Sequence, residues 1–290
     1  MQHPQVDVFF DDDSNTFSYI VRDPASKSCA IVDPVLDFDY ASGCTGTKSA
    51  DEMIAFIKQH DLELELIIET HVHADHLSSA PYLKQQLGGE MLIGEHIRTV
   101  QDTFGKVFNE GTEFARDGSQ FDRLVKDGDT LAIGQLKGQA MYTPGHTPAC
   151  VTFVFGDAAF VGDTLFMPDA GTARTDFPGG SASDLFDSIT RILALPEQTR
   201  LFMCHDYGAP GRKEVAYLTS VAEERAKNIH VADGTSREQY IAVREARDKT
   251  LGMPRLIVPS LQVNMRAGDM PPPEDNGIAY LKVPLNVLGK

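Results

Sequence analysis

"ETHVHADHLSS", residues 69–79, places three histidines and an aspartate within six positions, from His71 to His76. The run before it, "LELELIIET" (62–70), ends in apolar residues, which predicts a buried strand of an α/β sheet. The segment after it, "SSAPYLKQQLGG" (78–89), begins with serine caps and a proline and ends with two glycines, which predicts a helix. We therefore expect the cluster on a loop at the C-terminal end of a strand, where open α/β sheets bind their ligands.

The composition is that of an ordinary globular protein, with 290 residues, 42% of them hydrophobic and 23% charged. A net charge of −16 without a basic block argues against binding to nucleic acid or to anionic membranes. The sequence has no apolar run of about 20 residues, so it predicts no transmembrane helix. The acidic N-terminal segment differs from a signal peptide, so we expect a cytoplasmic protein. Four cysteines without a C-x-x-C pair indicate reduced thiols: Cys29, Cys44, Cys150 and Cys204.

Strands and helices alternate without a domain-scale linker. This predicts one domain over residues 1–290, with a core at about 15–230 and a short C-terminal extension at about 231–290. Residues 97–126 have weak periodicity and predict no defined element. The other expected strands lie at 16–23, 28–34, 90–96 and 199–206, with two more within 150–163 around Gly156–Asp157. The other expected helices lie at 181–195, 212–228 and 236–250.

Local motifs predict two element boundaries. Ser49 and Glu52 have the spacing of a capping box and predict the start of a helix over 49–61. Residues 126–143 predict a hairpin-like pair of strands, in which Asp127–Gly128 is a turn signal. Isolated histidines are expected at the surface or as helix caps: His60, His96 and His230.

Three further residues that could bind a metal follow predicted strands, as the first cluster does. They are His146 in "TPGHTP", Asp163 in "VGDT" and His205 in "CHDY". If these strands run side by side, the loops converge at one edge of the sheet. The complete set is His71, His73, Asp75, His76, His146, Asp163 and His205. Imidazole and carboxylate donors suit zinc, iron or manganese, and the spacing suits one metal with either a second site or surrounding groups that orient its ligands.

In this order the motifs "THVHADH" (70–76), "TPGHTP" (143–148), "GDT" (162–164) and "CHDY" (204–207) resemble the metallo-β-lactamase superfamily. The resemblance implies a four-layer αββα sandwich with the metal site at one edge. Within that superfamily, three segments resemble the persulfide (sulfur) dioxygenases of the bacterial type, which are related to glyoxalase II. These segments are "GTARTDFPGG" (171–180), "HDY" (205–207) and "VPSLQVNMRAG" (258–268).

The resemblance implies one Fe²⁺ per chain, bound by His71, His146 and Asp163. Such a facial set of two histidines and one carboxylate leaves coordination positions open for substrates. The implied reaction oxidises glutathione persulfide with O₂ and water to sulfite and glutathione. The remaining members of the cluster would orient ligands or take part in catalysis: His73, Asp75, His76 and His205.

Two other functions stay open. A glyoxalase-II-like glutathione thioester hydrolase would use a dinuclear site, with Asp75, His76 and His205 on the second metal. A non-catalytic redox-sensing partner protein would leave the ligand set without a purpose. The residues expected to bind substrate are Arg174, Tyr207 and Arg266, although Arg174 could instead pair with Asp176 or Asp169. Apolar surface expected on the helices at 212–250 would allow a homodimer.

Overall fold

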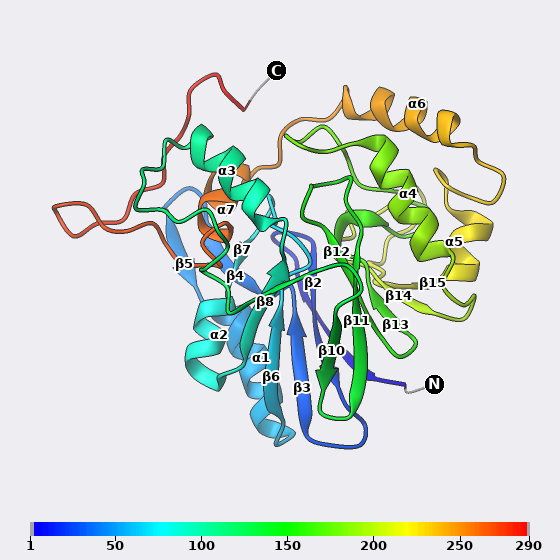
Figure 1. Cartoon of the computed structure of the whole chain (residues 1–290), viewed down its shortest axis with the longest axis horizontal. Coiled ribbons are helices and arrows are strands. Elements are labelled where there is room, and N and C mark those ends of the chain that lie inside the picture. The colour runs from blue at the N-terminus through cyan, green and yellow to red at the C-terminus, as the bar shows by residue number, and fades with distance from the viewer. Residues whose placement is uncertain (1–2, 289–290) are drawn as a thin grey trace.

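The computed structural model describes residues 3–288 and contains two six-stranded sheets packed face to face (Figure 1). Across the first sheet the order is β1 (Gln5–Asp11), β2 (Thr16–Arg22), β3 (Ser28–Val32), β6 (Glu63–Ile68), β8 (Glu90–Gly94) and β9 (Arg123–Val125). Across the second it is β10 (Thr130–Ile133), β11 (Leu136–Tyr142), β12 (Val151–Phe155), β13 (Ala158–Phe160), β14 (Arg200–Phe202) and β15 (Leu218–Ser220). A small third sheet has the order β5 (Cys44–Gly46), β4 (Val35–Asp39) and β7 (Leu77–Ser78).

Helices cover the outer face of each large sheet, so the molecule has the four layers of an αββα sandwich (Figure 1). The helices on the side of the first sheet are α1 (Lys48–Gln59), α2 (Ala80–Leu87), α3 (Ile97–Val107) and α7 (Ile257–Asn264). Those on the side of the second are α4 (Ala182–Leu193), α5 (Val221–Lys227) and α6 (Arg237–Asp248). The predicted α/β sandwich is therefore confirmed.

Three apolar clusters separate the four layers, because strands buried on both faces send alternate side chains to opposite sides. On β2, Tyr19 and Val21 lie in the cluster between the two sheets, whereas Ile20 lies in the cluster beneath α1–α3. The third cluster packs α4 and α6 against the second sheet through Leu185 and Tyr240. No helix within residues 3–288 combines the length and the apolar character needed to cross a bilayer.

Most expected elements are present, and several local predictions are wrong. The capping box does not form, because α1 begins at Lys48 and the Ser49 hydroxyl donates instead to Asp37 Oδ1 at 2.6 Å. The turn expected at Asp127–Gly128 is present and precedes β10, whereas the hairpin of β10 and β11 has its own turn at Gly134–Gln135.

Two longer segments also differ from the prediction. Residues 97–126, expected to be irregular, contain α3 and β9. The helix expected at 212–228 is shorter and begins at Val221, after β15. In both segments the apolar pattern is completed by contacts with distant residues, as Phe104 and Val221 each join a core cluster. Residues 257–264 of the C-terminal extension form α7, which was not expected.

Candidate metal centre

Four loops from both large sheets bring the candidate ligands together. His71 to His76 lie between β6 and β7, at the end of the first sheet. The second sheet supplies His146 after β11, Asp163 in the short 3₁₀ turn after β13, and His205 after β14. The prediction of one edge of a single sheet is therefore too simple, because the site lies where the edges of two stacked sheets meet.

One set of donors consists of His71, His146 and Asp163, all at least nine-tenths buried. Asp163 Oδ2 lies 3.5 Å from His146 Nε2 and 3.9 Å from His71 Nε2. One ligand atom from each residue falls within 4.8 Å of the others, which is a spacing that one cation could bridge. Two imidazoles and one carboxylate form the ligand set of a facial triad.

Hydrogen bonds at the far side of the imidazoles orient this set. His146 Nδ1 lies 2.8 Å from the carbonyl oxygen of Arg174, which it can reach only as a donor, so Nε2 keeps its lone pair. His71 Nδ1 lies 3.0 Å from the hydroxyl of Thr70. The opposite atom, His71 Nε2, and Asp163 Oδ1 are buried and have no hydrogen-bond partner within the described chain. Because unpartnered buried polar atoms are costly, these residues fit a bound metal ion.

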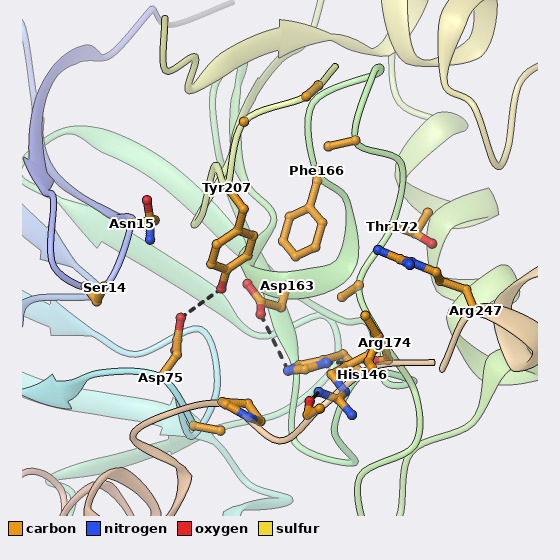
Figure 2. Close-up of a pocket in the computed structure, with 18 of the residues that line it drawn as sticks. Ser14, Asn15, Asp75, His146, Asp163, Phe166, Thr172, Arg174, Tyr207 and Arg247 are labelled. Atoms are coloured by element: carbon orange, nitrogen blue, oxygen red, sulfur yellow. Dashed lines mark hydrogen bonds and ion pairs between the residues drawn. The ribbon is translucent and has the colours of Figure 1, made fainter. Parts of the chain in front are cut away.

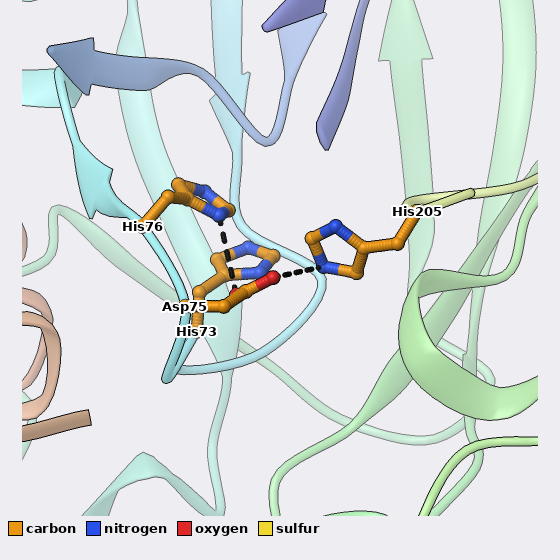
Figure 3. Close-up of side chains that lie close together, drawn as sticks. All are labelled: His73, Asp75, His76 and His205. Carbon is orange, nitrogen blue, oxygen red and sulfur yellow. Dashed lines mark ion pairs between the residues drawn. The ribbon is translucent and has the colours of Figure 1, made fainter. Parts of the chain in front are cut away.

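A second group of donors lies beside the first and consists of His73, Asp75, His76 and His205 (Figure 3). Asp75 is central in this group. Its Oδ2 lies 3.1 Å from His205 Nε2, and its Oδ1 lies 3.4 Å from His76 Nδ1. Thr16 Oγ1 lies 3.3 Å from the same nitrogen, His76 Nδ1, and 3.2 Å from the second nitrogen of His205, Nδ1. His205 Nε2 also lies 3.3 Å from Asp163 Oδ1, so the two groups are contiguous.

Two buried acidic residues that no sequence motif indicated, Asp33 and Glu69, contact and orient the residues of the cluster. Asp33 accepts hydrogen bonds from the backbone and hydroxyl of Thr70 and lies 3.0 Å from His73 Nε2. Glu69 lies 3.4 Å from the same nitrogen and accepts from Ser78. Burial lowers the pKa of His73, but the attraction of Asp33 and Glu69 outweighs it, so the pKa is well above its usual value. A signal for Asp33 was present: like the ligands, it directly follows a buried strand.

The first set opens into a cavity of about 630 Å³, which is within the range of small-molecule sites. His146, Asp163 and Asp75 lie on its floor, and Phe166 and Tyr207 form an aromatic wall beside them (Figure 2). The two rings contact edge to face, with centroids 6.0 Å apart. The Tyr207 hydroxyl donates to Asp75 Oδ2 at 3.0 Å, so the wall is tied to the second group of donors.

The three residues predicted to bind substrate have different positions. Tyr207 lines the cavity, as does Arg174. However, the Arg174 fork donates to Asp176 at 2.6 and 2.9 Å, and its third nitrogen donates to the carbonyl of Gly252. Arg266 lies outside the cavity lining, buried in an ion pair with Glu110 at 2.6 Å.

Other cavity residues were missed by reasoning from the sequence. His230, expected at the surface, lies against Thr172 and lines the cavity. Burial and then the nearby Arg244 and Arg247 lower the pKa of His230 to about 4, which makes it a neutral hydrogen-bonding group. Arg247 itself, at the end of α6, and Arg255 also line the cavity. No local motif marks these positions.

Comparison with known proteins agrees with this geometry. Residues 11–205 match the family model described as the metallo-beta-lactamase superfamily. A probable metallo-hydrolase of Burkholderia pseudomallei is 55% identical over 98% of this chain and 99% of that one. Glyoxylase B2 of Dictyostelium discoideum is 48% identical over 98% of each chain. The mitochondrial persulfide dioxygenase ETHE1 of Homo sapiens is 30% identical over 91% of this chain and 88% of that one.

Solved structures show the same relationship. The crystal structure of ETHE1 from Myxococcus xanthus superposes with a TM-score of 0.72 at 32% identity, over 91% of this chain and 100% of that one. A metallo-beta-lactamase from Staphylococcus aureus superposes with a TM-score of 0.71, at 19% identity, over 91% of this chain and 72% of that one. This second likeness supports the fold alone. The matched family model, the αββα sandwich and the metal-binding side chains at its edge agree. The chain therefore belongs to the metallo-beta-lactamase superfamily.

Proposed function

We propose that this protein is a persulfide dioxygenase with one Fe²⁺ per chain. It would oxidise glutathione persulfide with O₂ and water to sulfite and glutathione. Support comes from the persulfide dioxygenase relatives, which align over about nine-tenths of the chain, and from the segment 171–180, which resembles that family. Other relatives are named metallo-hydrolase or glyoxylase, so the proposal depends on the site itself.

The observation that carries the proposal is the difference between the carboxylates of the two groups, because buried imidazole nitrogens without a hydrogen-bond partner occur in both, as at His76 Nε2 and His205 Nε2 in the second group. His71 Nε2 and Asp163 Oδ1, in the first set, are buried without a hydrogen-bond partner. Asp75, which a dinuclear hydrolase would need as a ligand, has both oxygens engaged by His76, His205 and Tyr207. A single metal on the first set is therefore compatible with the hydrogen bonds already present.

Each group of residues would have a separate task. Ferrous iron, when bound by two histidines and one aspartate, supplies open positions and the redox chemistry that O₂ activation requires. The Arg174 carbonyl and Thr70 hydroxyl hold the ligand imidazoles in place. Phe166 and Tyr207 cover one side of the cavity and would exclude water from the persulfide sulfur.

A second candidate is a glutathione thioester hydrolase with two metals. It is favoured by the second group, whose four ligand atoms lie within 4.8 Å of one another, and by the relative named Glyoxylase B2. In that case Asp75 would exchange its contacts with His76 and His205 for a metal ion. A non-catalytic sensor would keep the metal but turn over neither substrate.

Metal analysis combined with two assays separates these functions. We expect protein purified anaerobically to contain about one iron per chain and to consume O₂ with glutathione persulfide but not with glutathione. Two zinc ions per chain, with rapid cleavage of S-lactoylglutathione and no oxygen uptake, would establish the hydrolase instead. Iron without either activity would favour the sensor.

A further inference from the structure

Two arginines differ from the others because they form no ion pair with a carboxylate of the described residues. The chain has fourteen arginines and an excess of acidic residues, 42 against 26 basic ones. Twelve of the fourteen have a carboxylate oxygen within 4.0 Å. Within the described residues, only Arg247 and Arg255 have no such partner. Arg255 has only a weak longer-range attraction to the exposed Asp39.

These two arginines lie at the same place, on the cavity that opens to the proposed metal site. Arg247 is on the last turn of α6, and Arg255 is on the loop between α6 and α7. Figure 2 shows the Arg247 side chain extending past Thr172 toward the cavity, across from the wall formed by Phe166 and Tyr207. Both arginines are solvent-exposed, so a ligand entering the cavity can reach them.

The segment that carries Arg247 is fixed to residues 172–175, a stretch that contributes to the cavity lining. Arg244 is buried on the same helix, pairs with Asp248 at 2.6 Å and donates to the carbonyl of Thr172 at 2.8 Å. Asp248 in turn accepts hydrogen bonds from the backbone and hydroxyl of Thr175. Arg247 itself makes only a 3.3 Å contact with the hydroxyl of Thr250. The backbone is thus held while the guanidinium stays available, which reduces the entropy lost on binding a ligand.

We propose that Arg247 and Arg255 bind the carboxylates of the substrate at the mouth of the cavity. The ligand class, a thiol or persulfide that carries carboxylates, such as the glutathione tripeptide, rests on the proposed function. Guanidinium groups match carboxylates with two parallel hydrogen bonds. This assignment replaces Arg174 in that role, because Asp176 and Gly252 already accept from its nitrogens.

The net negative charge of the molecule favours such a pair of cations at the cavity. An anionic ligand approaches a protein of net charge −16 against its overall field. Two cations without internal partners supply a local attraction at the place where the ligand must enter. An exposed arginine that is merely solvated is the alternative, and it would make no difference to ligand binding.

The test measures binding separately from turnover. S-methylglutathione, whose sulfur is blocked, and its diethyl ester, which lacks the carboxylate charges, are titrated calorimetrically into the purified protein. The variants are Arg247→Gln, Arg255→Gln and the double variant. Arg225→Gln is the matched control, since this half-buried arginine pairs with Asp233 and lies outside the cavity lining.

We expect the wild type and the control to bind S-methylglutathione equally, and the double variant to bind it about tenfold more weakly or worse. The diethyl ester should bind weakly and equally to all five proteins. Equal affinity of wild type and double variant for S-methylglutathione would overturn the inference, as would equal affinity of wild type for acid and ester, or no binding at all.

Oxygen uptake then separates this inference from the proposed function. If both hold, the double variant raises the KM for glutathione persulfide about tenfold or more, while kcat and iron content stay unchanged. If the wild type binds S-methylglutathione through the two arginines yet consumes no oxygen with the persulfide, the proposed reaction fails and the carboxylate site stands.

Discussion

Two atoms of the proposed metal ligands are buried without a hydrogen-bond partner within the described residues. These atoms are His71 Nε2 and Asp163 Oδ1. Both residues also have a ligand atom within reach of one shared cation. His146 completes the set from a different loop. Their affinity for a metal ion depends on geometry, because three ligand atoms must contact the same ion.

The first prediction concerns these ligands. Replacing His71, His146 or Asp163 by Ala should remove most of the iron, because two remaining protein donors compete poorly with water. His60→Ala is the matched control, since this exposed imidazole lies against Phe56 of its own helix, with its Nδ1 2.9 Å from the Phe56 carbonyl oxygen. Plasma emission spectrometry of anaerobically purified variants measures the iron. Full iron occupancy in the ligand variants would refute the assignment.

Residues of the second group should behave differently from the ligands. His73→Ala and His205→Ala are expected to lower turnover more than iron content, because in the mononuclear proposal they contact groups around the metal. Iron loss equal to that of the ligand variants would instead place them on the metal. The same two measurements, iron per chain and oxygen uptake, decide between these outcomes.

A second prediction concerns Asp33, which orients His73 from below. Asp33→Asn keeps the size of the side chain but removes the charge that faces His73 Nε2 and the second acceptor oxygen that Thr70 uses. We expect about 10- to 100-fold weaker iron binding with the fold intact, as for other groups that support metal ligands. A competition titration with a chelator measures the affinity. Asp61→Asn, at the exposed end of α1, should leave it unchanged.

At the scale of elements, the loop between β11 and β12 depends on a single glycine that sits against α4. Gly145 has a φ of +139°, and a Cβ there would lie 2.4 Å from Leu185 Cα. The loop is tied to the start of the helix, since Ser181 donates to the Gly145 carbonyl at 2.8 Å. His146, the next residue, is therefore positioned by close contact between a turn and a helix.

The third prediction follows from this contact. Gly145→Ala should lower the free energy of unfolding by about 2 kcal/mol or more, because backbone strain and a clash with helix backbone act together. Iron content should fall as well, since His146 moves with the loop. Gly43→Ala is the control: its φ is +69°, but no atom lies within 4 Å of the new Cβ, so a cost of about 1 kcal/mol is expected. Urea denaturation measures both.

At the scale of the whole molecule, four layers bury many polar groups, and one acid outside the metal site carries a cost that depends on pH. Glu224 is completely buried on α5. Burial raises its pKa from 4.5 to about 8, against the hydrogen bond that Asn228 donates to Oε2. The folded state therefore keeps a proton that the unfolded state releases above pH 4.5.

The fourth prediction is the pH dependence that results. A raised folded pKa adds stability that is fully present below about pH 4.5 and is lost as pH rises to about 8. Between these limits the wild type should lose on the order of 1 kcal/mol per pH unit relative to Glu224→Gln. Urea unfolding of both proteins at pH 5, 6, 7 and 8 measures the difference. A constant difference across this range would show that Glu224 does not stay protonated in the fold.

The sequence by itself determined the superfamily, the sandwich and the set of possible ligands. Each of these depends on contiguous residues: the period of a buried strand, the start of a helix, and short motifs such as residues 70–76 and 143–148. Local signals failed where a distant group competed for the same side chain. Ser49 does not cap its helix because Asp37 accepts its hydroxyl hydrogen.

The tertiary structure alone decided how the ionisable side chains are paired. His71 and Asp163 are 92 positions apart in the sequence (163 minus 71), yet their donor atoms lie 3.9 Å apart. The sequence does not distinguish Arg174 from Arg247 and Arg255. In the described structure, only Arg174 of these three forms an ion pair with a carboxylate. Electrostatic and hydrogen-bond energies fall steeply with distance, so they depend on neighbours in space. Sequence motifs specify which groups are present, and the packing of two sheets and their helices specifies which of them meet.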